Sequence, residues 1–413
     1  MFNYDDLIIK LPSLSREDLN IKIKTIFNKN LTTNIYDINP KLISKYEVDI
    51  DKEIDIIKWN KYKSLSILLN PYALVNINNS EYKQLEYAFK FKQITKCTEK
   101  KKILSRAYYK MWEMILHFNL IESSYKDGLV CANVAEGPGG FIQAIIYYRI
   151  KYGAKDNFKK DKLYGITIKD ISDNLRFDKN KLSNKFIDFY GNKLGLLNIS
   201  YGGDNGDITK INVIKNYIKL FSKRKAHLCT ADGGIEAKSA IIKEAVNALI
   251  IINETIIALS VLALGGHFVL KIYTVTTYTI DLLQLLSYYF DEVYITKPVT
   301  SRLFNSEKYI VAKKFKGISS CELDKLYQLS VDLKKIEKDN YIISIFDNKI
   351  NEELLNKINE YNENHYLLRK KYMKKMNNFN MKDYKNINKL LSFNQDTSLE
   401  WCDKMKLDFL IEN

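Results

Sequence analysis

The sequence LVCANVAEGPGGF occupies residues 129–141 and joins an apolar run to a glycine-rich turn. The run Leu129–Ala135 has the length and composition of a buried strand, and Phe141–Ile150 continues with helical spacing. Glycines between a strand and a helix let the backbone turn sharply and approach a ligand without a Cβ clash. The spacing is not G-x-G-x-x-G, so the dinucleotide fingerprint is not met. The stretch therefore predicts a ligand-binding turn, although a turn needed only for packing would have the same composition.

Strand-like and helix-like segments alternate on the C-terminal side of this turn. Six more apolar runs suit strands, and they are Leu163–Ile168, Leu196–Tyr201, Ala226–Ala231, His267–Ile272, Glu292–Thr296 and Tyr309–Lys313. Helical spacing in 211–221 and 237–264 separates several of them. Such alternation is typical of a mostly parallel sheet that helices cover on both faces. Only a short loop joins the last two runs, which predicts an antiparallel hairpin at the edge of the sheet.

The chain has 413 residues, of which 46% are hydrophobic, enough for one large domain with extensions or for two domains. Composition changes along it, because turn signals interrupt the first part and lysine-rich helical patterns follow Gly317. We therefore predict an N-terminal accessory region of helical or α+β character (1–95), an α/β domain (96–317) and a basic helical C-terminal region (318–413).

A formal charge of +15 and a pI near 9.2 indicate a polyanionic partner, either nucleic acid or an acidic membrane surface. Lysines recur from Lys90 to Lys110 and again around Arg369-Lys370-Lys371. These runs are either RNA-binding surfaces or solvated helix faces. Asn, Lys, Ile and Tyr are all abundant and have AT-rich codons, so codon bias is an alternative origin of the charge.

Other features bear on the compartment. The five cysteines are widely spaced and form no C-x-x-C pair, which favours a reducing compartment over a disulfide framework. The N-terminus lacks the pattern of a signal peptide, and polar residues interrupt the apolar stretch Ala245–Leu264, which we interpret as a buried helix. We expect a cytoplasmic protein without a membrane partner, in a viral factory or virion if the AT-rich bias reflects a virus, and a nuclear location stays open.

Four motifs supply residues for acid–base chemistry, namely Lys110, Asp232, Lys271 and Glu307. The motifs are SRAYYK (105–110), ADGG (231–234), GGHFVLK (265–271) and KPVTSRLFNSE (297–307). A lysine can act as a general base only if its pKa falls far below about 10.4. Burial and a second positive charge both lower it, so we expect two lysines to converge on one pocket. Taken singly, each residue is better explained as a solvent-exposed lysine, a helix cap or a surface ion pair, and only the four motifs together favour catalysis.

Two more loops follow predicted strands, at Gly165-Ile166-Thr167 and at Gly202–Thr209. Ligands on parallel sheets bind beyond the carboxyl ends of the strands, where these loops lie. Asp207 could accept a hydrogen bond from an amino group such as that of adenine, although a plain surface turn would also explain its loop. The four histidines have no metal-ligand spacing, so we predict no metal site.

The motifs between Ser105 and Lys316 resemble those of the FtsJ-like ribose 2′-O-methyltransferases and follow one another in the same order as in that family. They look closest to the mRNA-cap branch of the family. The resemblance implies a Rossmann-like class I methyltransferase fold, with a seven-stranded, mostly parallel sheet and an antiparallel last strand. It also implies S-adenosylmethionine as the cofactor. One departure is that the second strand ends in Thr167 and Lys169, where other methyltransferases commonly carry an acidic ribose ligand.

The resemblance also implies roles for individual residues. Cofactor-binding residues would be Glu136, Gly137, Pro138, Gly139, Gly140, Phe141, Thr167, Asp207 and Asp232. In the catalytic set, Lys271 would be the base, Lys110 would modulate and orient it, Asp232 would link the lysines to the cofactor, and Glu307 would anchor hydrogen bonds. No metal is needed, because a sulfonium is already an activated methyl donor.

The implied activity is methylation of the 2′-hydroxyl of the first transcribed nucleotide of capped mRNA, with RNA and other capping or transcription proteins as partners. Two alternatives remain. One is methylation of an internal ribosomal or transfer RNA ribose, and the other is an inactive RNA-binding subunit that keeps the methyltransferase fold.

Overall fold

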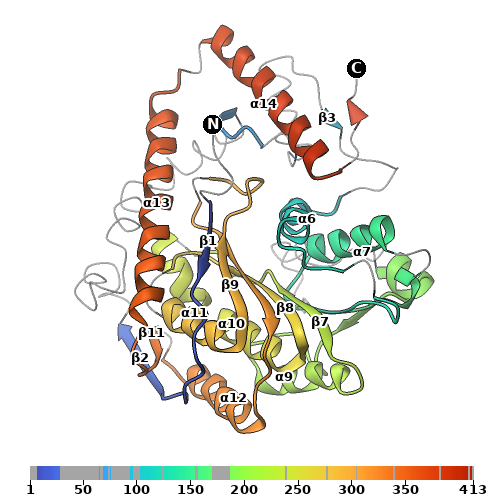
Figure 1. Ribbon diagram of the computed structural model, residues 1–413, viewed down its shortest axis with the longest axis vertical. Helices are drawn as coiled ribbons and strands as arrows, with labels where there is room; N and C mark the ends of the chain where they lie inside the picture. Colours follow the sequence, from blue (N-terminus) through green and yellow to red (C-terminus); the bar gives the residue numbers. More distant parts are fainter. Residues whose placement is uncertain are drawn as a thin grey trace.

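An eight-stranded sheet forms the centre of the computed structural model, with the strand order β1-β9-β10-β8-β7-β4-β5-β6 (Figure 1). The structure describes residues 7–27, 65, 68–72, 75, 94–95, 103–122, 125–153, 157–169, 187–237, 240–275, 278–303, 305–337, 340–380, 383–407 and 410–411. The strands are β1 (Ile8–Leu11), β4 (Val130–Val134), β5 (Lys162–Ile166), β6 (Leu197–Ser200), β7 (Ala226–Ala231), β8 (Leu262–Ile272), β9 (Phe290–Thr296) and β10 (Lys308–Phe315).

The topology confirms the predicted α/β class. Strands β6, β5, β4, β7 and β8 pair in parallel, and β10 lies antiparallel between β8 and β9. All seven predicted strands are present, and the last of them is antiparallel, as expected. The predicted position of the final hairpin at the edge was wrong, because β1 pairs antiparallel with β9 and covers it. Four residues from near the N-terminus thus add an eighth strand to the sheet.

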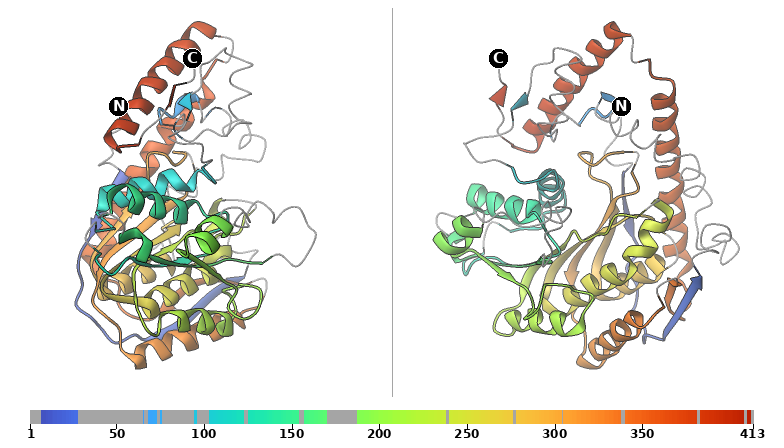
Figure 2. Two further views of the ribbon diagram at one scale, coloured as in Figure 1. Left: turned by 90° about the vertical axis from the view of Figure 1, so that its right-hand side faces the viewer. Right: turned by 180° about the vertical axis from the view of Figure 1, so that it is seen from behind.

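Helices cover both faces of this sheet (Figure 2). Helices α6 (Ala107–Phe118) and α7 (Gly140–Tyr152) pack on one face, and α9 (Ile211–Ile218), α10 (Ala240–Val261) and α11 (Tyr278–Tyr289) pack on the other. Alternation along the strands explains the two layers, because Cys131 points to the first face, whereas Val130 and Ala132 point to the second. The sheet is therefore buried on both faces, and the loops that follow its parallel strands lie at one edge.

Helix α10 corresponds to the long apolar stretch of the sequence. By length and composition, the window Lys243–Val261 is the one candidate membrane span among the described residues, but 78% of that window is buried inside the fold. Its apolar side chains pack against the sheet, for example Ile251 and Ile257. We therefore assign α10 as a core helix.

The C-terminal region is largely helical, as predicted, with α12 (Ser320–Lys334), α13 (Glu352–Asn377) and α14 (Tyr384–Lys404). Helix α13 runs beside the β1 edge of the sheet, and α14 lies beyond the carboxyl ends of the strands (Figures 1 and 2). Two small antiparallel pairs join this region to the N-terminal part, β2 (Ile21–Phe27) with β11 (Asn340–Phe346) and β3 (Ile94–Thr95) with β12 (Leu410–Ile411). Most of the predicted basic run from Lys90 onward lies outside the described residues.

Candidate active site

Lys110 and Glu307 form one ion pair at the carboxyl edge of the sheet. Lys110 comes from the first turn of α6, and Glu307 directly precedes β10. The Nζ atom of Lys110 lies 2.5 Å from Oε1 of Glu307, and both side chains are less than one-fifth exposed. Ser301 adds a hydroxyl hydrogen bond of 3.1 Å to the same oxygen.

Lys271 and Asp232 form a second ion pair beside the first. Strands β7 and β8 are parallel neighbours in which Ala231 pairs with Leu270. The next residues, Asp232 and Lys271, therefore lie side by side. The Nζ atom of Lys271 lies 3.2 Å from Oδ1 of Asp232 and donates to the Asp232 carbonyl at 2.5 Å. The register of two strands therefore brings these residues together.

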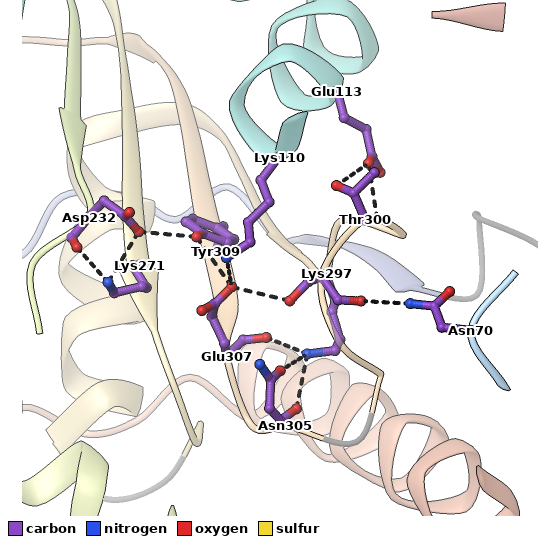
Figure 3. Close-up of polar contacts among 11 residues, drawn as sticks. Asn70, Lys110, Glu113, Asp232, Lys271, Lys297, Thr300, Asn305, Glu307 and Tyr309 are labelled. Atoms are coloured by element: carbon purple, nitrogen blue, oxygen red, sulfur yellow. Dashed lines mark hydrogen bonds and ion pairs between the residues drawn. The ribbon is translucent and has the colours of Figure 1, made fainter. Parts of the chain in front are cut away.

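Tyr309 connects the two ion pairs (Figure 3). Its hydroxyl lies 3.1 Å from Oδ1 of Asp232 and 3.4 Å from Oε1 of Glu307. Tyr309 pairs with Lys271 across the β8–β10 ladder, which places its ring at the centre of the cluster. Tyr309 belongs to the last of the sequence motifs, which predicted no role for this residue. All four predicted catalytic residues thus meet in one cluster, to which the structure adds Tyr309.

The charges of this cluster change one sequence-based expectation. Burial lowers the pKa of Lys271, but the carboxylate of Asp232 leads the influences that raise it, and the net pKa lies above the ordinary value. Burial raises the pKa of Glu307, but Lys110 and Lys271 outweigh this effect and hold the pKa well below its usual range. The expected lowering of the Lys271 pKa was therefore wrong for the free protein, because carboxylates surround the ammonium more closely than other cations do.

Buried groups on α10 hold the turn that carries Asp232. The backbone N–H of Gly233 donates to Glu254 at 3.0 Å, and Asn247 accepts from the N–H of Ile235 at 2.6 Å. Glu254 lies fully inside the protein, and burial raises its pKa to about 8. A side chain at Gly233 would collide with Glu254, which explains why glycine follows Asp232.

Lys297 and Glu113 stabilise the loop that carries Glu307. Lys297 is fully buried and donates to the carbonyls of Asn305 and Glu307 at 2.9 and 2.6 Å. Burial lowers the pKa of Lys297 well below its ordinary value. Glu113, one turn after Lys110 on α6, accepts from the N–H of Val299 at 2.9 Å. Sequence reasoning gave neither residue a role, because a charged residue that is buried by distant segments carries no local signal.

The glycine-rich turn has the predicted geometry. Gly139 has a φ of 100°, which favours glycine, and it immediately precedes α7. Gly140 lies so close to the start of α6 that a Cβ would collide with Ser105. Phe141, a predicted cofactor-binding residue, is buried against Tyr309 with ring centroids 5.8 Å apart, so it links the turn to the ion-pair cluster.

The loops after β5 and β6 meet beside this turn. The N–H of Lys169 donates to the carbonyl of Asn205 at 2.7 Å, and Gly206 packs closely on the carbonyl of Thr167. Asp207 is partly exposed, and its Oδ1 accepts two hydrogen bonds from Thr209, at 2.9 and 2.8 Å. The loops that carry Thr167 and Asp207 therefore lie at the same edge of the sheet as the glycine turn, as the sequence predicted.

Two carboxyl groups at this edge can accept hydrogen bonds from a ligand that carries amino groups. Glu136 is buried, burial raises the pKa of its carboxyl well above the usual range, and its Oε2 has no hydrogen-bond partner among the described residues. The Oδ2 atom of Asp207 also accepts no hydrogen bond from the part of the chain that the structure describes. S-adenosylmethionine carries an ammonium and an adenine amino group, so the carboxyl groups of Glu136 and Asp207 fit this cofactor. The other residues predicted to bind the cofactor stay a prediction, and they are Gly137, Pro138, Gly139, Gly140, Phe141, Thr167 and Asp232.

Comparison with known proteins gives a matching family and several relatives. The FtsJ-like methyltransferase family matches residues 103–315, which is half of the chain. The chain is 31% identical over 276 residues to "Cap-specific mRNA (nucleoside-2'-O-)-methyltransferase 1" of Mus musculus, covering 63% of this chain and 31% of that protein. It is 32% identical over 219 residues to "Probable methyltransferase EP424R" of African swine fever virus, covering 51% of this chain and 49% of that protein. The chain thus spans about a third and about half of the lengths of these relatives.

A solved structure of human methyltransferase-like protein 13 superimposes with a TM-score of 0.32 at 13% identity, covering 56% of this chain and 94% of that chain.

Proposed function

Since the chain belongs to the FtsJ-like methyltransferase family, which depends on S-adenosylmethionine, we propose that it methylates the 2′-hydroxyl of the first transcribed nucleotide of capped mRNA. One observation carries this proposal. The ion pairs Lys110–Glu307 and Lys271–Asp232, joined by Tyr309, lie beside the glycine-rich turn at the carboxyl edge of the sheet. These groups can hold a ribose hydroxyl and take its proton at the place where a methyl donor would bind.

Lys271 is the proposed base. A ribose hydroxyl is a weak acid, so its reaction near neutral pH benefits from a positioned proton acceptor. Neutral Nζ of Lys271 takes the proton as the 2′-oxygen forms its bond to the methyl carbon. When bound, S-adenosylmethionine supplies that methyl group on a positively charged sulfonium, which leaves as a neutral thioether. Asp232 holds Nζ through two contacts, 3.2 Å and 2.5 Å long, and so restricts its direction.

The charge balance of the cluster decides when Lys271 can act. In the free protein, Asp232 is the largest influence that raises the pKa of Lys271, which favours the ammonium. Positive charge that arrives near this ammonium lowers its pKa. We propose that Lys271 becomes a competent base only when the methyl donor is in place, while Lys110 stays paired with Glu307.

Glu307 and Tyr309 act as positioning groups in this proposal. Glu307 is fixed by Lys110 and by the hydroxyl of Ser301. Because the Tyr309 hydroxyl reaches both Asp232 and Glu307, a displacement of either carboxylate disturbs the other. The ribose would therefore meet a set of polar groups whose positions are mutually constrained, which lowers the entropic cost of orienting it.

The choice of capped mRNA rests on two supports. Several relatives carry names that specify the mRNA cap, among them those of Mus musculus and Homo sapiens. The net charge of +15 suits an RNA substrate. Relatives from viruses, including that of African swine fever virus, support a viral origin. We also propose a cytoplasmic location and partners among capping or transcription proteins.

A methyl-transfer assay with capped and uncapped RNA of the same sequence, run in parallel, tests the substrate. We expect transfer from labelled S-adenosylmethionine to the capped transcript and at least about tenfold less to the uncapped one, the ratio that a difference of about 1.4 kcal/mol in transition-state binding gives. Equal rates on the two RNAs would refute the cap assignment and favour an internal ribose. Binding of RNA without any transfer would favour the inactive subunit.

A further inference from the structure

One face of α10 supports the turn that follows Asp232, and Lys243 lies on that face. Lys243, Asn247, Ile250 and Glu254 follow one another at intervals of four, three and four residues, which aligns them along a helix. Asn247 contacts both the N–H and the carbonyl of Ile235, and Glu254 accepts from Gly233. Lys243 therefore lies one turn before Asn247, on the helix face whose other residues contact the turn after Asp232.

Lys243 lies over an aromatic ring of the same site. Its Nζ atom is 4.5 Å from the centroid of Tyr273, a distance typical of a cation–π contact. Tyr273 follows Lys271 by two residues and is only 4% exposed, so its ring supports Lys243 rather than stacking on a base. The Tyr273 hydroxyl packs against Gly234, which also lies close to Lys271. Tyr273 thus lies between Lys243 and the turn next to Lys271, and it places Lys243 beside the catalytic cluster.

The charge of Lys243 is not neutralised by an ion pair within the described part of the chain. Burial lowers the pKa of Lys243 and the carboxylate of Glu307 raises it. The more weakly acting Lys271 and Lys110 lower it, and Glu236 raises it. The charges of Glu307 and Lys271 therefore act on Lys243, which places its ammonium close to the cluster. Lys110 and Lys271 each form an ion pair with a carboxylate, whereas the ammonium of Lys243 is available to bind an anionic ligand.

We infer that Lys243 binds a phosphate of the substrate RNA next to the ribose that is methylated. This inference rests on the proposed function and identifies one contact with the substrate. A lysine ammonium is a compact point charge on a flexible stem, which suits a phosphate oxygen. Its partly buried position, supported by the Tyr273 ring, would direct the ammonium toward the RNA backbone beside the catalytic cluster.

Fluorescence anisotropy of a labelled capped oligonucleotide over a series of salt concentrations tests the contact. Lys243→Gln should weaken RNA binding about tenfold and reduce the log–log salt slope by about 0.7, the value for one phosphate on a single strand. Lys243→Arg should retain most of the affinity. Lys219→Gln is the matched control, because Lys219 is exposed, contacts Asn216 on α9 and should leave both quantities unchanged.

Steady-state kinetics and calorimetry separate this role from others. The Lys243→Gln variant should raise KM for RNA and leave kcat and the affinity for S-adenosylmethionine unchanged. An unchanged salt slope together with a lowered kcat would overturn the inference and make Lys243 a residue that tunes Lys271. Thermal unfolding shows whether Lys243→Gln has lost its structure. In that case the RNA affinity and salt slope of Lys243→Arg decide whether Lys243 binds a phosphate. If the wild type transferred no methyl group, the proposed function would fail, while the salt series would still test the phosphate contact.

Discussion

The hydroxyl of Tyr309 donates a hydrogen bond of 3.1 Å to Oδ1 of Asp232, which joins two residues that are 77 positions apart. Because Asp232 holds Lys271 and the same hydroxyl lies near Glu307, this contact links the two ion pairs of the cluster. The geometry of the proposed base is therefore set by a residue that carries no charge in the neutral pH range, since burial raises the pKa of Tyr309 well above its ordinary value.

Removal of this hydroxyl should slow methyl transfer. A hydrogen bond to a charged group contributes about 1.5–3 kcal/mol, so Tyr309→Phe should lower kcat by roughly 10- to 100-fold if the contact matters in the transition state. Tyr294→Phe is the control, because its hydroxyl also donates to a carboxylate, that of Glu292 on the same sheet, at 2.6 Å. Equal activity of the two variants in a single-turnover assay would show that Tyr309 does not position the cluster.

Lys271→Ala tests the assignment of the base. Loss of a positioned proton acceptor should reduce the rate by a factor on the order of 10² or more. Cofactor binding, followed by calorimetry, should survive, since Lys271 is not among the residues proposed to hold the cofactor. Lys313→Ala on β10 serves as the control for a lysine in the same sheet. Activity within a few-fold of wild type would remove Lys271 from the role and direct attention to Lys110.

The pH dependence follows from the direction of the Lys271 pKa. A base must lose its proton before it acts, and Asp232 and its neighbours hold the pKa of Lys271 above the ordinary value despite burial. The rate constant for methyl transfer should therefore rise with pH through the neutral range. Asp232→Asn removes the largest influence that raises this pKa, so the rising limb should move to lower pH, with a lower maximum because Nζ loses a contact.

Asp204→Asn is the matched control for that profile, because Asp204 pairs with Lys210 in the loop after β6. Its pH profile should coincide with that of the wild type. A rising limb that stayed in place in Asp232→Asn would show that Asp232 does not set the pKa of the group that is titrating.

Gly139→Val tests the cofactor turn. Gly139 has a φ of 100°, and a β-branched residue at positive φ costs about 1–3 kcal/mol and displaces the turn. Calorimetry should then detect no binding of S-adenosylmethionine. Gly195→Val is the control, because Gly195 also has a positive φ, of 62°, but no neighbouring atom would meet a Cβ there. Unchanged affinity in Gly139→Val would place the cofactor elsewhere.

Much of the fold could be predicted because its signals are local. The strand Val130–Val134 is a continuous apolar run that ends at a glycine-rich turn, as expected for a strand buried on both faces. The strand Ile8–Leu11 was missed, because four residues within a turn-rich region carry little periodic signal. Its stability comes from pairing with Val293–Thr296, a partner almost three hundred positions away that no local pattern reveals.

The site shows the same division. The meeting of Lys110, Asp232, Lys271 and Glu307 could be predicted because each lies in a recognisable motif. The contacts of Tyr309, Glu113 and Lys243 join distant segments, so only the folded chain reveals them. The pKa of Lys271 is the clearest case. The sequence indicated a nearby lysine that would lower the pKa of Lys271. The direction of the pKa shift depends on how many carboxylates surround the ammonium, and only the folded chain determines that number.

Nuclease mapping of the methylated position on a capped transcript tests the central claim most directly. The transcript is methylated with labelled S-adenosylmethionine and digested to nucleotides, and the label is located in the capped 5′ fragment or in internal nucleotides. The account predicts label on the 2′-oxygen of the first transcribed nucleotide, with none after reaction with Lys271→Ala. Label spread over internal riboses, or on a base rather than a ribose, would contradict it.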